Sequence, residues 1–128
     1  MGFKGPGLPF DTGWALLRLG RWIDSIVQLE QFEKAVPGRG KTSEFLGQAY
    51  LGLKQYDDRA EAKLKEAIQR DPGLKPTALL YLAVLERERT NPTAAERYLE
   101  TLLNEAPDSA IARTLKKQME PVPDPKKK

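Results

Sequence analysis

The stretch that decides the fold runs from Phe45 to Pro72 and reads FLGQAYLGLKQYDDRAEAKLKEAIQRDP. Its first part has an apolar, small and aromatic face, in which Leu46 and Gly47 lie four and three residues before Tyr50. Its second part has a face made by Ala60, Leu64 and Ala67. Spacings of three and four place side chains on one side of a helix. Because Lys54–Gln55 separates the two patterns, the stretch predicts two helices joined by a tight turn.

The same pattern recurs every 35 residues along the chain. Prolines recur at Pro37, Pro72 and Pro107. Three further columns recur: all leucine at Leu29, Leu64 and Leu99; all small at Ser25, Ala60 and Ala95; all apolar at Phe32, Ala67 and Leu102. Proline cannot continue a helix and restricts the residue before it, so each proline is expected to follow the second helix of a hairpin. The sequence therefore predicts three stacked helical hairpins.

These residues resemble the tetratricopeptide repeat, whose unit has about 34 residues. The resemblance is strongest in residues 43–72 and covers about residues 11–119. The second unit carries roughly one extra residue, near Asp57–Asp58. The third unit has Glu86 where an aromatic residue is usual. The first unit departs most, with Thr12-Gly13 in place of Leu-Gly and Ser25 in place of Ala.

The resemblance implies an all-α fold, a right-handed α-solenoid of three helix-turn-helix repeats with a C-terminal capping helix. We expect the repeats at about residues 11–38, 39–73 and 74–108. The cap is expected at 109–119, where Ile111, Leu115 and Met119 share one apolar face. Residues 1–10, rich in Gly and Pro, are predicted to be an extended N-terminal segment. Residues 120–128 are predicted to form an extended tail rich in Pro and Lys.

The amino-acid composition excludes several kinds of functional site. The 128 residues include no Cys and no His, which excludes disulfides and the usual zinc and thiolate sites. We therefore expect no enzyme activity, no metal and no cofactor. The net charge of +3 equals the charge of Lys126–Lys128, because the other 18 basic residues balance 18 acidic ones. Three lysines at one end of the chain would bind nucleic acid only weakly, so we do not expect nucleic acid as a partner.

The sequence has neither a stretch long enough to span a membrane nor the layout of a signal peptide. Gly5, Pro6, Gly7 and Pro9 interrupt any apolar N-terminal segment. A cytoplasmic location is the expectation, with a processed periplasmic chain as the alternative.

The resemblance also implies that the first helices of the repeats line a concave face that binds a protein or peptide. Register with the family places nine candidate residues there: Trp14, Lys41, Phe45, Gln48, Leu51, Tyr81, Val84, Arg87 and Glu88. Aromatic and aliphatic anchors flanked by polar groups suit a partner helix or an extended apolar peptide. The alternative for several of them is packing against neighbouring helices. The Lys, Asn and Arg set that clamps a carboxylate in some family members is missing.

A phosphate-loop pattern occurs at Ala35-Val36-Pro37-Gly38-Arg39-Gly40-Lys41-Thr42. That chemistry needs a strand leading into the loop. Here the preceding residues are predicted to be helical, and Pro37 lacks a backbone donor, so a turn between repeats is the preferred interpretation. Nucleotide binding through Gly40-Lys41-Thr42 remains a remote alternative.

Two local features have structural interpretations. The acidic pair Asp57–Asp58 is expected to cap a helix start, and Glu61 with Lys65 to form a surface ion pair. Phe3, Leu8 and Phe10 are expected to cap the first repeat, with contact to a partner or second copy as the alternative.

The function expected from the sequence is a non-catalytic adaptor or scaffold that binds a partner in its concave groove. The alternative is a structural subunit of a larger assembly, or a repeat protein that associates with itself. Three repeats are close to the minimum for independent stability, which makes support from a neighbour plausible.

Overall fold

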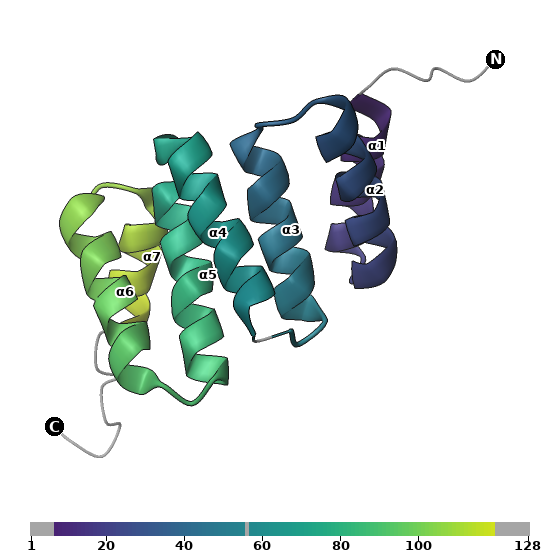
Figure 1. Ribbon diagram of the computed structural model, residues 1–128. Coiled ribbons are helices and arrows are strands. Elements are labelled where there is room, and N and C mark those ends of the chain that lie inside the picture. Colours follow the sequence, from purple (N-terminus) through teal and green to yellow (C-terminus); the bar gives the residue numbers. More distant parts are fainter. Residues whose placement is uncertain (1–6, 56, 120–128) are drawn as a thin grey trace, which may run out of the picture.

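A computed structural model of the chain describes residues 7–55 and 57–119. Within these residues there are seven α-helices and no strand. The helices, in chain order, are α1 (Gly7–Arg18), α2 (Trp22–Ala35), α3 (Gly40–Gly52), α4 (Asp58–Arg70), α5 (Lys75–Glu88), α6 (Pro92–Glu105) and α7 (Ala110–Met119). They stack as three hairpins and a final helix, with α1 and α2 at one end and α6 and α7 at the other (Figure 1). The predicted all-α solenoid is confirmed.

The prolines of the repeat lie just beyond the second helix of each hairpin. Helix α2 ends at Ala35, α4 at Arg70 and α6 at Glu105, each two residues before the proline. Side chains cap the starts of two later helices: Asp57 accepts from the Arg59 N–H and Asn91 from the Ala94 N–H. These caps satisfy N–H groups that have no partner within the helix.

The turn inside every hairpin has the same geometry. One residue adopts a left-handed backbone conformation: Gly20 (φ 76°), Lys54 (φ 62°) and Thr90 (φ 61°). In each turn its N–H bonds the carbonyl three residues back, and the next N–H bonds the carbonyl five residues back. This pair of bonds is the Schellman ending of a helix. Only the first turn uses glycine, which adopts this conformation without steric strain.

Small residues allow the two helices of a hairpin to approach closely. A Cβ atom built on Gly13 would lie 2.7 Å from Cγ of Leu29, and one on Gly47 would lie 2.7 Å from Cγ of Leu64. In the first hairpin the Ser25 hydroxyl donates a 2.7 Å hydrogen bond to the Gly13 carbonyl. Serine at position 25, where the other two repeats have alanine, thus adds a hydrogen bond between the two helices while the side chain stays small.

Two apolar clusters form the core, one centred on Leu29 and Leu46 and the other on Leu64 and Leu82. Tyr50 is partly buried and packs against both clusters, so it links the first hairpin to the rest of the stack.

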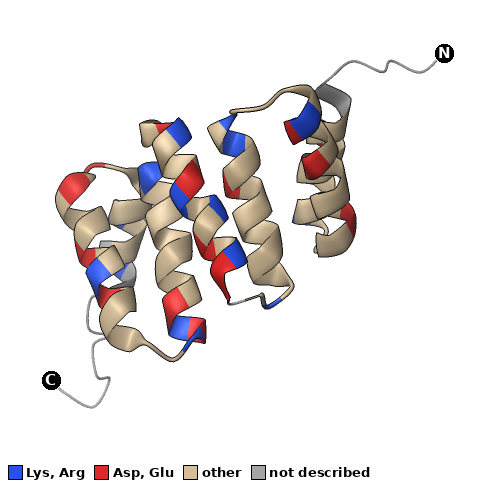
Figure 2. Cartoon of the chain, in the orientation of Figure 1, with Lys and Arg blue, Asp and Glu red and all other residues tan. Residues whose placement is uncertain are grey.

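Ion pairs connect successive repeats, and charged residues of both signs lie along α4 (Figure 2). Arg70 bonds Glu33 of the first repeat at 2.8 Å and the Ser43 hydroxyl at 2.9 Å. Arg89 of the third repeat bonds Glu61 of the second at 2.6 Å. The predicted pair of Glu61 with Lys65 is also present, at 2.7 Å. Hydrogen-bonded pairs of this kind fix the relative position of neighbouring repeats.

The prediction of an extended segment over residues 1–10 is wrong for residues 7–10, because α1 begins at Gly7. Pro9 lies in the first turn of this helix, where a missing N–H breaks no helical bond. The Phe10 ring lies 5.0 Å from that of Phe32 and 5.4 Å from that of Phe45, so Phe10 does cap the first repeat. Phe3, the Leu8 side chain and the tail at 120–128 lie outside the described residues.

Candidate binding groove

The first helices of the repeats line an open hollow of about 400 Å³, which we call the groove. Helix α1 contributes its last turn, α3 its second half and α5 its middle. Eight residues line it: Leu17, Arg18, Trp22, Gln48, Leu51, Gly52, Tyr81 and Val84. Four of the nine predicted binding residues are therefore brought together here: Gln48, Leu51, Tyr81 and Val84.

The groove wall at α2 depends on a glycine. A Cβ atom on Gly52 would lie 2.3 Å from Cδ2 of Trp22, so the indole lies directly against the α3 backbone. Any larger residue at position 52 would displace Trp22, because protein interiors have no spare space for a methyl group at that distance. Sequence reasoning missed this pair, since the contact joins different repeats.

A buried carboxylate lies beside the groove. Glu44 is only 2% exposed, and its Oε1 accepts a 3.2 Å hydrogen bond from Nε2 of Gln48. Nζ of Lys41 lies 3.6 Å from the same oxygen, whereas Oε2 has no hydrogen-bond partner among the described residues. Burial raises the pKa of Glu44, and the nearby charge of Lys41 opposes this rise without cancelling it. Burial and the charge of Glu44 likewise raise the pKa of Tyr81.

Two exposed cations adjoin these residues. The Arg18 guanidinium lies 5.8 Å from the centre of the Trp14 ring, and Lys41 Nζ lies 5.5 Å from the centre of the Phe45 ring. Both distances are typical of cation–π contacts. Trp14 is 47% exposed and does not line the groove.

The placement of Phe45 on the binding face is wrong. Its side chain is only 8% exposed and packs in the core with Leu17 and Leu46. Its ring also stacks on Phe10. One residue along a helix turns the side chain by about 100°, so the position beside the groove belongs to Glu44, which the sequence interpretation passed over. The spacing of four between Glu44 and Gln48 could have indicated it.

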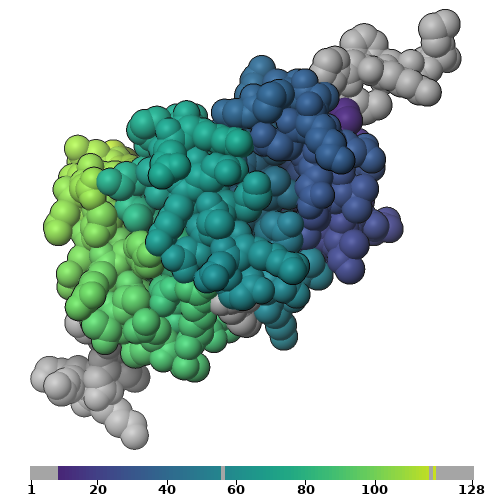
Figure 3. All heavy atoms as spheres, in the orientation of Figure 1, coloured from purple at the N-terminus to yellow at the C-terminus, as the bar shows by residue number. Residues whose placement is uncertain are grey.

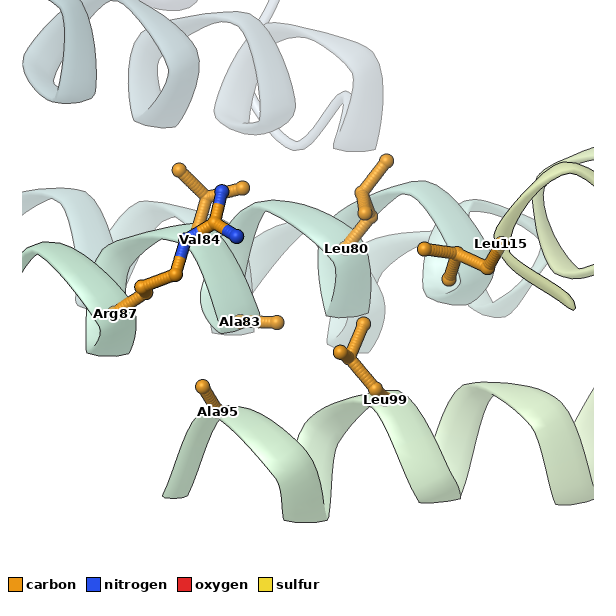
Figure 4. Close-up of a pocket in the computed structure, with 7 residues that line it drawn as sticks. All are labelled: Leu80, Ala83, Val84, Arg87, Ala95, Leu99 and Leu115. Carbon is orange, nitrogen blue, oxygen red and sulfur yellow. The ribbon is translucent and has the colours of Figure 1, made fainter. Parts of the chain in front are cut away.

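The remaining candidates lie apart from the groove. Lys41 and Glu88 are exposed and do not line it. Arg87 lines a second hollow of about 170 Å³, which we call the C-terminal slot (Figure 4). The slot is bounded by Leu80, Ala83, Val84 and Arg87 of α5, Ala95 and Leu99 of α6, and Leu115 of α7.

The phosphate-loop pattern does not form a phosphate loop. Residues 22–35 before it are helical, so no strand leads into Gly40-Lys41-Thr42. Gly40 begins α3 and is packed against α4, since a Cβ atom there would lie 2.8 Å from Cβ of Asp71. Thr42 is fully buried. A phosphate would meet a closed helix start beside a carboxylate rather than a cradle of free N–H groups.

Comparison with protein families agrees with this architecture. Two tetratricopeptide repeat models match the chain, one over residues 10–75 and the other over residues 58–119. The chain belongs to the tetratricopeptide repeat family. A search of curated proteins finds no match to it.

Two further observations concern the described part of this tetratricopeptide repeat protein. None of its helices is both long and apolar enough to cross a membrane. Its acidic residues do not gather in groups of three or more that could hold a metal ion.

Proposed function

We propose that this tetratricopeptide repeat protein is a non-catalytic adaptor or scaffold that binds a partner peptide or helix in the groove. The observation that carries the proposal is the groove itself, which offers the partly exposed Leu51 and Val84 as apolar contacts beside the polar Gln48 and Tyr81. Apolar anchors with a few polar groups are the usual basis of helix and peptide recognition.

The shape of the groove favours a peptide over a small molecule. Its volume of about 400 Å³ falls in the range of ligand pockets, but it is an open hollow spread over four helices. Such a surface suits one or two apolar side chains projecting from a partner helix. The exposed cation Arg18, which lines the groove, favours a partner with an acidic residue beside that anchor.

The proposal is tested by capturing partners from native extract with the wild type and two variants. Leu51→Glu places a charge in the groove, and Ala62→Glu places the same charge on the exposed face of α4. We expect the groove variant to lose specific partners, identified by mass spectrometry, that the wild type and the Ala62→Glu variant retain. Recovery of the same proteins by all three baits would contradict binding in the groove, provided that circular dichroism shows all three to be folded.

A further inference from the structure

The first hairpin exposes large apolar side chains. Among the described residues, four large hydrophobic side chains are exposed: Trp14 (47%), Leu19 (73%), Ile23 (65%) and Val27 (48%). Ile23 and Val27 are four residues apart on α2, so they form one ridge along the helix. We call this pair the outer ridge.

The outer ridge departs from the repeat. A shift of 35 residues aligns Ile23 with Asp58 and Thr93, and Val27 with Ala62 and Arg97. All four equivalents are exposed, and three of them are polar or charged. The stacking of this chain therefore gives no reason for Ile and Val at these two positions. Exposed apolar residues that packing does not require indicate an interaction surface.

The C-terminal slot lies at the other end of the molecule and is incompletely filled. Leu29 and Leu64 are fully buried, whereas their equivalent Leu99 is only half-buried. In the second repeat, Leu64 packs in one cluster with Leu79, Leu82 and Leu85 of α5. After the third repeat the following helix is α7, which contributes Leu115 to the slot. The slot lies between α5, α6 and α7, and the half-buried Leu99 is part of its lining (Figure 4).

The ridge and the slot complement each other in shape and charge. A ridge of aliphatic side chains on one helix fits the groove between two others. Helix α2 carries three acidic residues, of which Asp24 pairs with Arg21 and Glu33 with Arg70, and one basic residue. Helix α7 carries three basic residues and no acidic one. Arg87 adds a cation to the slot itself. Opposite charges on facing helices would orient the contact.

A single molecule cannot make this contact, because the first hairpin and α7 lie at opposite ends of the stack (Figures 1 and 3). We propose that copies of this chain associate head to tail, with the outer ridge of one copy docked in the C-terminal slot of the next. The occupant of the slot is thus a second copy of this chain. An association of this kind uses two different surfaces and builds an open chain of copies or a ring.

The proposal can be tested separately from groove binding, although Val84 lines both the groove and the slot. Ile23 belongs to the ridge alone and Leu51 to the groove alone, so Ile23→Asp and Leu51→Glu each change only one of the two surfaces.

The test is complementation between two variants, followed by sedimentation velocity and light scattering at micromolar to millimolar concentrations. Ile23→Asp disables the ridge and Leu99→Asp disables the slot. We expect the wild type to grow beyond the dimer as concentration rises, and each variant alone to remain a monomer. An equimolar mixture of the two should form a heterodimer and stop there, because only one intact ridge and one intact slot remain.

Ala62→Asp is the matched control, since it places the same charge at the position of Val27 one repeat later, and it should associate like the wild type. If Leu99→Asp does not fold, Arg87→Glu replaces it, because Arg87 is exposed. A wild type that stays monomeric throughout would overturn the proposal. Self-association that Ile23→Asp abolishes but that Leu99→Asp alone retains would mean ridge-to-ridge pairing, which also overturns it.

Discussion

Replacing Gly47 by alanine tests how the helices of a hairpin pack. The new Cβ atom would lie 2.7 Å from Cγ and from Cδ2 of Leu64, where ordinary contacts begin at 3.4 Å. Leu64 is fully buried and cannot move aside. Overpacking of this kind costs about 1–3 kcal/mol, while alanine gains about 1 kcal/mol over glycine within a helix. We therefore expect a net loss of about 1 kcal/mol in the free energy of unfolding.

The effect of Gly47→Ala on the free energy of unfolding should change sign when the Leu64 side chain is truncated. In a Leu64→Ala background, which by itself costs about 2–5 kcal/mol, the clash is gone and part of the cavity can be filled. Gly47→Ala should then stabilise the protein by about 1 kcal/mol. The coupling between the two positions is therefore about 2 kcal/mol.

Urea denaturation followed by circular dichroism at 222 nm gives the four free energies of this double-mutant cycle. Ala83 of the third repeat serves as a comparison, because it lines the C-terminal slot with the half-buried Leu99 and has room for its methyl group. Ala83→Gly should cost at least about 1 kcal/mol through helix propensity, and the loss of a buried methyl group adds to this cost. An equal loss from Gly47→Ala in both backgrounds would refute the close contact with Leu64.

Three further predictions concern stability and can be measured by urea or thermal denaturation. Because burial raises the folded-state pKa of Glu44, its contribution is fully favourable below the unfolded-state pKa and is lost as pH rises through the raised value. Glu44→Gln should thus be more stable than the wild type at neutral pH, and the difference should shrink towards about pH 4; a difference that does not change with pH would contradict this. Thr90→Gly should stabilise by about 1 kcal/mol, because a left-handed conformation is strained for a β-branched residue; a loss of stability would argue against the Schellman turn. Ser25→Ala should cost about 1 kcal/mol through loss of the buried bond to Gly13, and an unchanged midpoint would show that the bond contributes nothing.

The repeat architecture could be predicted from the sequence because it depends on local spacing. The recurrence of Pro37, Pro72 and Pro107 predicted the three hairpins, and the two apolar faces between Leu46 and Ala67 predicted the two helices of the second hairpin. Each repeat shows this spacing within its own 35 residues, so the chain displays the same pattern three times.

The details of the groove could not be predicted in the same way, because they depend on how one repeat is placed on the next. Phe45 was assigned to the binding face, whereas Glu44 lies beside the groove and Phe45 in the core. An error of one residue turns a helical side chain by about 100°. The contact of Trp22 with Gly52 likewise joins α2 to α3 across the boundary between repeats.

The start of α1 was missed for a different reason. Gly7 and Pro9 are usually read as residues that break helices, but the first turn of a helix tolerates both. What fixes this turn is the packing of Phe10 against Phe32 and Phe45, which are far away in the sequence.

Occupation of the groove by a partner can be tested by site-specific photo-cross-linking in native extract. A photoreactive residue is placed at Gln48, which lines the groove, or at Ala62, which is exposed on α4. We expect the photoreactive residue at position 48 to give a discrete cross-link to one partner protein, and the residue at position 62 to give none. Cross-links of equal yield from both positions, or from position 62 alone, would contradict it.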